Sequence, residues 1–278
     1  MKREELVRQI KRKVSMLCVG LDPDPERIPE RFLSEADPVL AFLKNVVDET
    51  ADFCVAFKPN LAFFEADGWR GMQRFETLVN YIKTKYPEQF IIADAKRGDI
   101  GNTARMYAKA YFEQLSCDAI TLSPYMGCDS IEPYLEFPNK WVIVLGLTSN
   151  AGAVDLELEQ MHNGELVYEH CMRKTSEHIS NDRLMFVVGA TRPEILGAIR
   201  QRFPEHFFLV PGVGAQGGSV EAVCAEAATT FGGLLINASR SILYPDNQSQ
   251  EPHRLAAWAM QRQMAPYISL KGFVASTD

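Results

Sequence analysis

Charged side chains of both signs follow a short apolar run in the segment FIIADAKRGDIGNT, residues 90–103. The apolar residues 90–93 are typical of a strand covered on both faces, as in a parallel sheet with helices packed against it. Side chains alternate between the two faces of a strand, so Asp94 and Lys96 are predicted to lie on the same side. Neighbouring carboxylates keep a lysine protonated, and a protonated lysine held against an acceptor is a proton donor.

Further charges follow two earlier apolar runs and the same strand. Asp22 lies in GLDPDP, Lys58 lies in AFKPN at the end of the second run, and Asp99 comes shortly after the strand-end pair. Each has a structural explanation when taken alone: an aspartate before proline suits a turn, a strand-end lysine can extend to water, and the pair could be a structural ion pair. Together they favour one shared site, because a buried charge is unfavourable unless several partners surround it.

A second set of residues is suited to binding phosphate. The segments VPGVGAQGGS (210–219) and INASRSIL (236–243) follow two later apolar runs. Glycines let backbone N–H groups approach an anion, Gln216 can donate from its amide, and Arg240 can donate two parallel hydrogen bonds to phosphate oxygens. The structural alternative is two tight turns and a surface arginine.

Neutral polar residues follow another apolar run. Thr148 and Ser149 lie in GLTSNAGA, after residues 141–147. Hydroxyl groups of this kind suit a polar heterocycle or a sugar. A helix N-cap is the alternative interpretation.

These residues must be positioned by a repeating pattern of strands and helices. The predicted strands span residues 15–20, 53–58, 90–95, 119–122, 141–147, 184–189, 206–211 and 231–237. Apolar residues at helical spacing lie between them, for example at 40–47, 75–82 and 195–199. Eight strand–helix units in about 250 residues predict a closed (β/α)8 TIM barrel of the α/β class, with an open doubly wound sheet as the alternative. In such barrels catalytic groups come from the carboxyl ends of the strands, so all these side chains are expected at one mouth.

We expect one domain over residues 1–278, since neither a linker nor a low-complexity run interrupts the pattern. Residues 1–13 are predicted to form a flanking helix, and residues from about 244 onward a tail. The longest connection, 149–181, is partly helical in pattern and could add a lid or an extra turn.

The composition narrows the class of protein. The chain has 46% hydrophobic and 23% charged residues and a net charge of −7, which argues against binding nucleic acid or an anionic membrane nonspecifically. Its six cysteines lack zinc-site spacing and are expected to be reduced thiols. An apolar signal segment and a run of 18 apolar residues are both lacking, so we expect a soluble, cytoplasmic protein. Neither a metal-ligand cluster nor a dinucleotide fingerprint is found in the sequence, which favours a site without metal or cofactor.

The motif DAKRGDIGNT resembles the Asp-x-Lys-x-x-Asp-Ile-x-x-Thr pattern of the orotidine 5'-phosphate decarboxylase family, in its longer, divergent branch, and the resemblance extends over residues 15–243. It implies decarboxylation of orotidine 5'-phosphate to uridine 5'-phosphate, the last step of de novo UMP synthesis, by a carboxy-lyase without cofactor. The catalytic array that the resemblance implies is Lys58, Asp94, Lys96 and Asp99. Lys96 then protonates C6 of the pyrimidine.

The same resemblance implies how the nucleotide is held and how subunits share the site. Asp22 corresponds to the ribose contact, Ser149 to the pyrimidine contact, and Gln216 and Arg240 to the phosphate contacts. Asp99, Ile100 and Thr103 correspond to residues that enter the neighbouring subunit's site, which implies a homodimer with shared active sites. One departure is the sequence Lys-Arg-Gly-Asp at 96–99, where many members have Lys-Phe-His-Asp.

Two other functions fit parts of the pattern. A phosphosugar decarboxylase or aldol-type synthase on the same barrel would use a metal, so chelation would abolish its activity. A non-catalytic nucleotide-binding protein would keep the phosphate site, yet it has no use for four clustered charges.

Overall fold

Eight parallel strands close into a barrel in the computed structural model, which describes residues 1–190, 192–213, 218–246 and 249–270. Each strand pairs with its neighbours in chain order, and β1 also pairs with β8, for example Cys18 with Asn237. The strands are β1 (Leu17–Leu21), β2 (Ala56–Pro59), β3 (Phe90–Arg97), β4 (Ala119–Leu122), β5 (Trp141–Leu145), β6 (Leu184–Val187), β7 (Phe207–Val210) and β8 (Leu234–Ala238). The prediction of a (β/α)8 barrel is confirmed, and closure through β1 and β8 excludes the open sheet.

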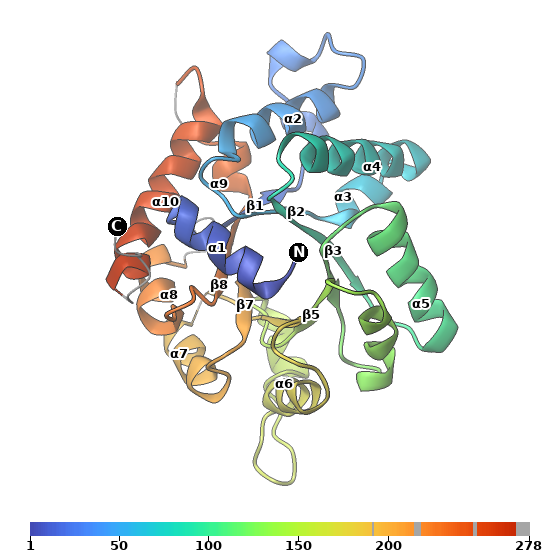
Figure 1. Cartoon of the computed structure of the whole chain (residues 1–278), viewed down its shortest axis with the longest axis vertical. Coiled ribbons are helices and arrows are strands. Elements are labelled where there is room, and N and C mark those ends of the chain that lie inside the picture. The colour runs from blue at the N-terminus through green and yellow to red at the C-terminus, as the bar shows by residue number, and fades with distance from the viewer. Residues whose placement is uncertain (191, 214–217, 247–248, 271–278) are drawn as a thin grey trace.

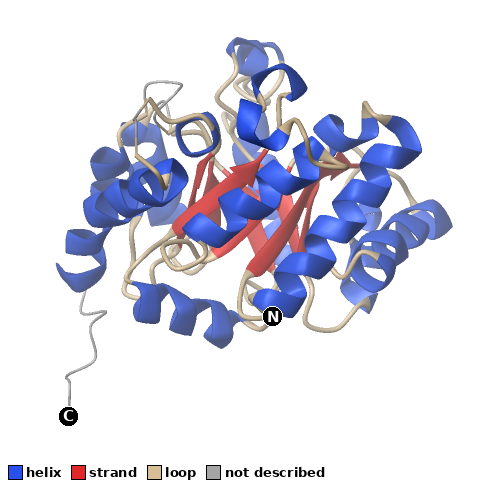
Figure 2. Ribbon diagram, turned by 90° about the horizontal axis from the view of Figure 1, so that it is seen from above, coloured by secondary structure: helices blue, strands red, loops and turns tan. Residues whose placement is uncertain are grey.

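Helices surround the barrel, so each strand is buried between the barrel interior and a helix (Figures 1 and 2). The α-helices are α1 (Arg3–Lys13), α2 (Pro38–Thr50), α3 (Leu61–Glu65), α4 (Gly68–Lys85), α5 (Gly101–Lys109), α6 (Val167–His178), α7 (Pro193–Arg202), α8 (Val220–Ala227), α9 (Arg240–Leu243) and α10 (Pro252–Leu270). This two-sided burial explains why the strands are continuous apolar runs in the sequence.

Helix α1 covers the end of the barrel at which the strands begin (Figure 1). Leu6 and Ile10 are fully buried under it, and Arg3 donates to the carbonyls of Asn181 and Glu205 in the turns before β6 and β7. That end is therefore closed, which leaves the opposite end, where the strands finish, for a site.

The region expected to be a tail contains α10, which packs against α2 and α8. Ala257, Met264 and Ile268 are buried on one face of α10, and the backbone N–H of His253 donates to the buried carboxylate of Glu49 at 2.9 Å. The helix therefore completes the ring rather than trailing from it.

The long connection 149–181 is partly helical, as its pattern predicts. A 3-10 turn spans Ala151–Asp155, a bridge joins Gln160 to Leu166, and α6 begins at Val167. Its first residues follow the carboxyl end of β5, so the connection borders the mouth of the barrel.

Two further observations concern the chain as a whole. All six cysteines lie among the described residues and are free thiols. Within the described ranges, every helix is too short or too polar to cross a bilayer.

Candidate active site

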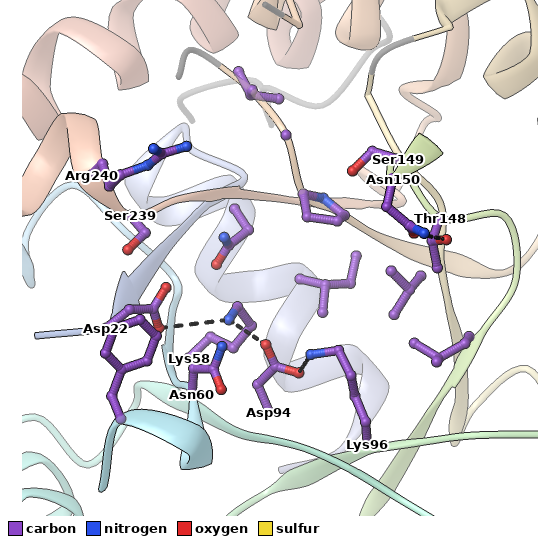
Figure 3. Close-up of a pocket in the computed structure, with 18 of the residues that line it drawn as sticks. Asp22, Lys58, Asn60, Asp94, Lys96, Thr148, Ser149, Asn150, Ser239 and Arg240 are labelled. Carbon is purple, nitrogen blue, oxygen red and sulfur yellow. Dashed lines mark hydrogen bonds and ion pairs between the residues drawn. The ribbon is translucent and has the colours of Figure 1, made fainter. Parts of the chain in front are cut away.

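A cavity of about 520 Å³ opens at the carboxyl ends of the strands. Its walls come from most strands of the barrel, and Figure 3 shows the charged and polar side chains that point into it. The lining includes, among the predicted residues, Asp22, Lys58, Asp94, Lys96, Thr148, Ser149 and Arg240. The sequence placed these side chains at one mouth, and the structure brings them to one cavity.

Asp94 is the centre of a row of alternating charges (Figure 3). Its Oδ2 accepts a hydrogen bond from Nζ of Lys58 at 2.7 Å, and its Oδ1 accepts one from Nζ of Lys96 at 2.7 Å. Oδ1 of Asp22 lies 4.0 Å from the Lys58 ammonium on its other side. Lys58 and Asp94 are 4% and 8% exposed, whereas the side chain of Lys96 is 51% exposed toward the cavity.

Lys58 and Asp94 both stay ionised, because the attraction between opposite charges outweighs the unfavourable desolvation of each group. Burial alone would lower the pKa of Lys58, but the carboxylates of Asp22 and Asp94 raise this pKa above its ordinary value. Burial alone would raise the pKa of Asp94, but Lys58 and Lys96 hold it well below its ordinary value. At neutral pH the buried pair is therefore an ammonium and a carboxylate.

The end of β3 differs from the regular strand that the sequence predicts. The pairing with β4 passes from Ala93 opposite Ile120 to Arg97 opposite Leu122, so three residues of β3 lie opposite Thr121 alone. Lys96 has φ of 46°, a left-handed conformation that is uncommon outside glycine and asparagine. Asp94 and Lys96 do share one side, as predicted, but a β-bulge rather than simple alternation brings their charged groups together.

Asp99, Ile100 and Thr103 lie outside the cavity of their own chain. Oδ1 of Asp99 accepts from the backbone N–H of Ile100 at 2.8 Å, just before α5. Ile100 is 51% exposed and Thr103 is exposed on the first turn of α5. None of the three therefore joins Asp94 and the two lysines within one chain.

Two of the predicted binding residues, Arg240 and Ser149, line other parts of the cavity wall. Arg240, the first residue of α9, is exposed and lines the wall beside Ser239, while Ser149 and Asn150 line the wall after β5 (Figure 3). Gln216 lies outside the described residues. Arg240 therefore lines the same cavity as the charged row.

A comparison with known proteins identifies the family. The model of the orotidine 5'-phosphate decarboxylase / HUMPS family matches residues 15–255. The chain belongs to this family.

Close relatives and a solved structure agree with that assignment. The chain is 49% identical to the orotidine 5'-phosphate decarboxylase of Parabacteroides distasonis over 276 residues, which cover 99% of both chains. It is 51% identical to that of Bacteroides fragilis strain YCH46, over 96% of this chain and 98% of the relative. The structure of Leishmania donovani OMP decarboxylase superposes with a TM-score of 0.82 at 33% identity, over 96% of this chain and 99% of that chain. The resemblance seen in the sequence and the prediction of a carboxy-lyase are confirmed.

Arg97, the first of the two residues that depart from the decarboxylase motif, makes its contacts outside the cavity. Arg97 forms an ion pair with Glu65 at the end of α3 and donates to Oη of Tyr111 at 3.0 Å. Arg97 thus joins β3 to α3 and to the π-helical turn Ala110–Gln114 that follows α5. It leaves the charged row in the cavity intact.

Sequence reasoning missed several residues that form this decarboxylase-family site. Glu157 accepts from the backbone N–H and from Oγ1 of Thr148, both at 2.7 Å, and so ties the long connection to the wall after β5. Oη of Tyr244 accepts from the backbone N–H of Asp24 at 2.7 Å and ties the turn after β1 to α9. Asn60 lines the cavity two residues after Lys58, a position that its place after a strand end could have indicated.

Among the described residues, no group of three or more histidine, cysteine or carboxylate side chains is arranged so that it could hold a metal ion. The cavity offers positive charge from lysines instead. The prediction of a reaction without metal or cofactor stays a prediction.

Proposed function

We propose that this chain decarboxylates orotidine 5'-phosphate to uridine 5'-phosphate without a metal or an organic cofactor. The observation that carries the proposal is the row of Lys58, Asp94 and Lys96, joined at 2.7 Å, in a cavity that also contains Arg240. Relatives of about 50% identity bear the name of this activity, which supports the same substrate here.

Lys96 is proposed as the proton donor. When the C6 carboxylate leaves as CO2, the electron pair of the broken bond stays on C6, and Nζ of Lys96 gives C6 a proton. Positive charge fixed beside C6 before the reaction stabilises the developing carbanion, and this electrostatic stabilisation is the main source of rate enhancement that such a site offers. Lys58 is buried and holds Asp94 ionised and in place. Asp94 beside the substrate carboxylate adds repulsion that is relieved as CO2 departs.

The rest of the nucleotide is proposed to bind far from the reacting carbon. Asp22 would contact the ribose, Ser149 the pyrimidine, and Gln216 and Arg240 the phosphate. Binding energy from such remote groups can be used to orient the base against Lys96.

We also propose that the enzyme is a homodimer in which Asp99, Ile100 and Thr103 complete the neighbouring subunit's site. Asp99 does not line the cavity of its own chain, which supports its donation elsewhere. Large apolar side chains are exposed on α5, before it and after the adjacent strand β4: Ile100 (51%), Met106 (49%), Tyr125 (81%) and Met126 (46%). Exposed apolar surface of this kind is typical of an interface.

Mixing two inactive variants tests the shared site. Lys96→Ala and Asp99→Asn are expected to be inactive alone, but a mixed dimer contains one site with both residues intact. Random reassociation makes half of the dimers mixed, so an equal mixture should regain about a quarter of the wild-type activity. A mixture as inactive as its components would contradict the shared site.

The reaction itself is tested by the loss of orotidine 5'-phosphate absorbance on addition of purified protein in EDTA. We expect turnover that chelation leaves unchanged. Loss of activity in EDTA would favour a metal-dependent phosphosugar enzyme, and binding of the nucleotide without turnover would favour a binding protein. The free cysteines and the negative net charge support a cytoplasmic enzyme of this kind that does not bind nucleic acid.

A further inference from the structure

We infer that Thr121 of β4 is a positioning residue for Lys96, and that its hydroxyl sets the backbone conformation from which Lys96 reaches the substrate. Thr121 is 1% exposed and lies beneath the charged row rather than in the cavity wall. The inference rests on the proposed role of Lys96 as proton donor.

The hydroxyl of Thr121 makes three hydrogen bonds to one stretch of β3. Its Oγ1 accepts from the backbone N–H groups of Ala95 and Lys96, both at 2.9 Å, and donates to Oδ1 of Asp94 at 3.0 Å. A hydroxyl has one proton and two lone pairs, so these bonds use its full capacity. A single side-chain atom therefore joins three consecutive residues of the catalytic strand.

The bulge in β3 explains why this atom is needed. Three residues of β3 lie opposite Thr121, so the N–H groups of Ala95 and Lys96 cannot both find carbonyl partners in the ladder. The Thr121 hydroxyl takes the place of those partners. It also stabilises the left-handed backbone of Lys96, a conformation that is unfavourable for a residue with a side chain.

The same bond directs the carboxylate that holds the lysine. Oδ1 of Asp94 accepts from both Thr121 and the ammonium of Lys96, so the hydroxyl fixes the position of the acceptor to which Lys96 points. Because the Lys96 side chain is half exposed, its ammonium is positioned mainly by this carboxylate and by the backbone of the bulge. A shift of the bulge therefore moves the ammonium. A displacement of about 1 Å can reduce turnover on the order of a hundredfold.

The test compares Thr121→Val, which keeps the shape and removes the hydroxyl, with Thr121→Ser, which keeps the hydroxyl. For Thr121→Val we expect kcat for orotidine 5'-phosphate to fall about 10- to 100-fold, while KM and the Kd for uridine 5'-phosphate stay within about threefold. For Thr121→Ser we expect kcat within about threefold of wild type, because the hydroxyl is restored. If the valine variant does not fold, Thr121→Ala takes its place in the comparison.

Several results would overturn the inference. One is a folded valine variant with kcat within twofold of wild type, and another is an equal loss of kcat in the serine and valine variants. A third is a parallel loss of kcat and of uridine 5'-phosphate binding, which indicates a collapsed cavity rather than a misplaced lysine.

A crystal structure of the variant without the hydroxyl separates this inference from the proposed function. We expect Lys96 to leave the left-handed region and its ammonium to lie more than about 4 Å from Asp94, beyond hydrogen-bond distance. An unchanged bulge with the ammonium still hydrogen-bonded to Asp94 would refute the role of Thr121, whatever reaction the wild type catalyses. Absence of turnover by the wild type would refute the proposed function alone.

Discussion

Replacing Asp94 with asparagine should strongly destabilise the protein, although the two side chains have the same shape. The Asp94 carboxylate accepts hydrogen bonds from two ammonium groups at 2.7 Å, and the neutral amide oxygen of asparagine is a weaker acceptor. The substitution also removes the negative charge between the two lysines. Lys58 then remains as a buried cation whose nearest carboxylate, that of Asp22, is 4.0 Å away. Lys96 is half exposed and can turn to water.

The magnitude follows from these two different environments. Breaking a buried pair by removing one partner reduces the free energy of unfolding by about 3–5 kcal/mol, which is the loss expected at Lys58. A half-exposed pair such as that of Lys96 contributes about 0–1 kcal/mol. We therefore expect a total loss of about 3–6 kcal/mol at pH 7 for Asp94→Asn. Asp52→Asn, which changes an exposed ion pair with Arg254, should lose less than about 1 kcal/mol and serves as the control.

The pH dependence of this loss has a definite sign. In the wild type the folded pKa of Lys58 lies above its ordinary value of 10.5, so its contribution is fully present below pH 10.5 and is lost as pH rises through the folded pKa. Without Asp94, burial becomes the dominant effect and brings the folded pKa of Lys58 down toward or below that of the unfolded chain. The folded variant then sheds its proton more readily than the wild type, so the difference in stability between them should shrink as pH rises.

Urea unfolding at pH 7 and pH 9.5 measures both quantities. The double variant Lys58→Met/Asp94→Asn removes the uncompensated charge and should be more stable than Asp94→Asn alone. A loss below about 1 kcal/mol for Asp94→Asn, or a loss that grows from pH 7 to pH 9.5, would refute the reasoning about the buried pair.

Three further predictions concern other parts of the molecule. Arg240→Ala should reduce kcat/KM about 10- to 100-fold through the loss of charged hydrogen bonds to phosphate, and full efficiency would remove Arg240 from the phosphate site. Glu157→Gln should raise KM up to about tenfold by loosening the wall held through Thr148, whereas Glu159→Gln on the exposed surface should leave KM unchanged. Burial lowers the pKa of His206 from 6.5 to about 4, so the unfolded chain binds a proton that the folded chain lacks between these values. Stability should therefore fall on acidification from pH 6.5 to pH 4, by at most about 1.4 kcal/mol per pH unit, and urea unfolding of His206→Phe should show a smaller fall.

The barrel could be predicted from the sequence because a strand that is buried on both faces is a continuous run of apolar residues. Continuous apolar runs such as residues 90–93 and 141–145 need no knowledge of their neighbours to be recognised. Charges that follow these runs are equally visible, so Asp94, Lys96 and Lys58 could be assigned to one mouth from the geometry of parallel barrels alone.

The features that the sequence did not predict depend on contacts between distant residues. The bulge after Ala93 arises from the register between β3 and β4, and Thr121 has no local feature that separates it from any other strand residue. Glu157 lies in a connection whose path over the mouth depends on the fold as a whole. The buried face of α10 follows a helical spacing that was present in the sequence, but it is weakened by the exposed Trp258 and Leu255 on the same helix.

The most direct test of the central claim is the rate at which Lys96→Ala converts orotidine 5'-phosphate to uridine 5'-phosphate, followed by absorbance in EDTA. Lys174→Ala, which removes an exposed lysine of α6 remote from the cavity, is the matched control. We expect wild-type turnover for the control and a fall of at least about a thousandfold for Lys96→Ala, with folding and uridine 5'-phosphate binding retained. Turnover by Lys96→Ala within about tenfold of wild type would contradict the assignment of Lys96 as the proton donor.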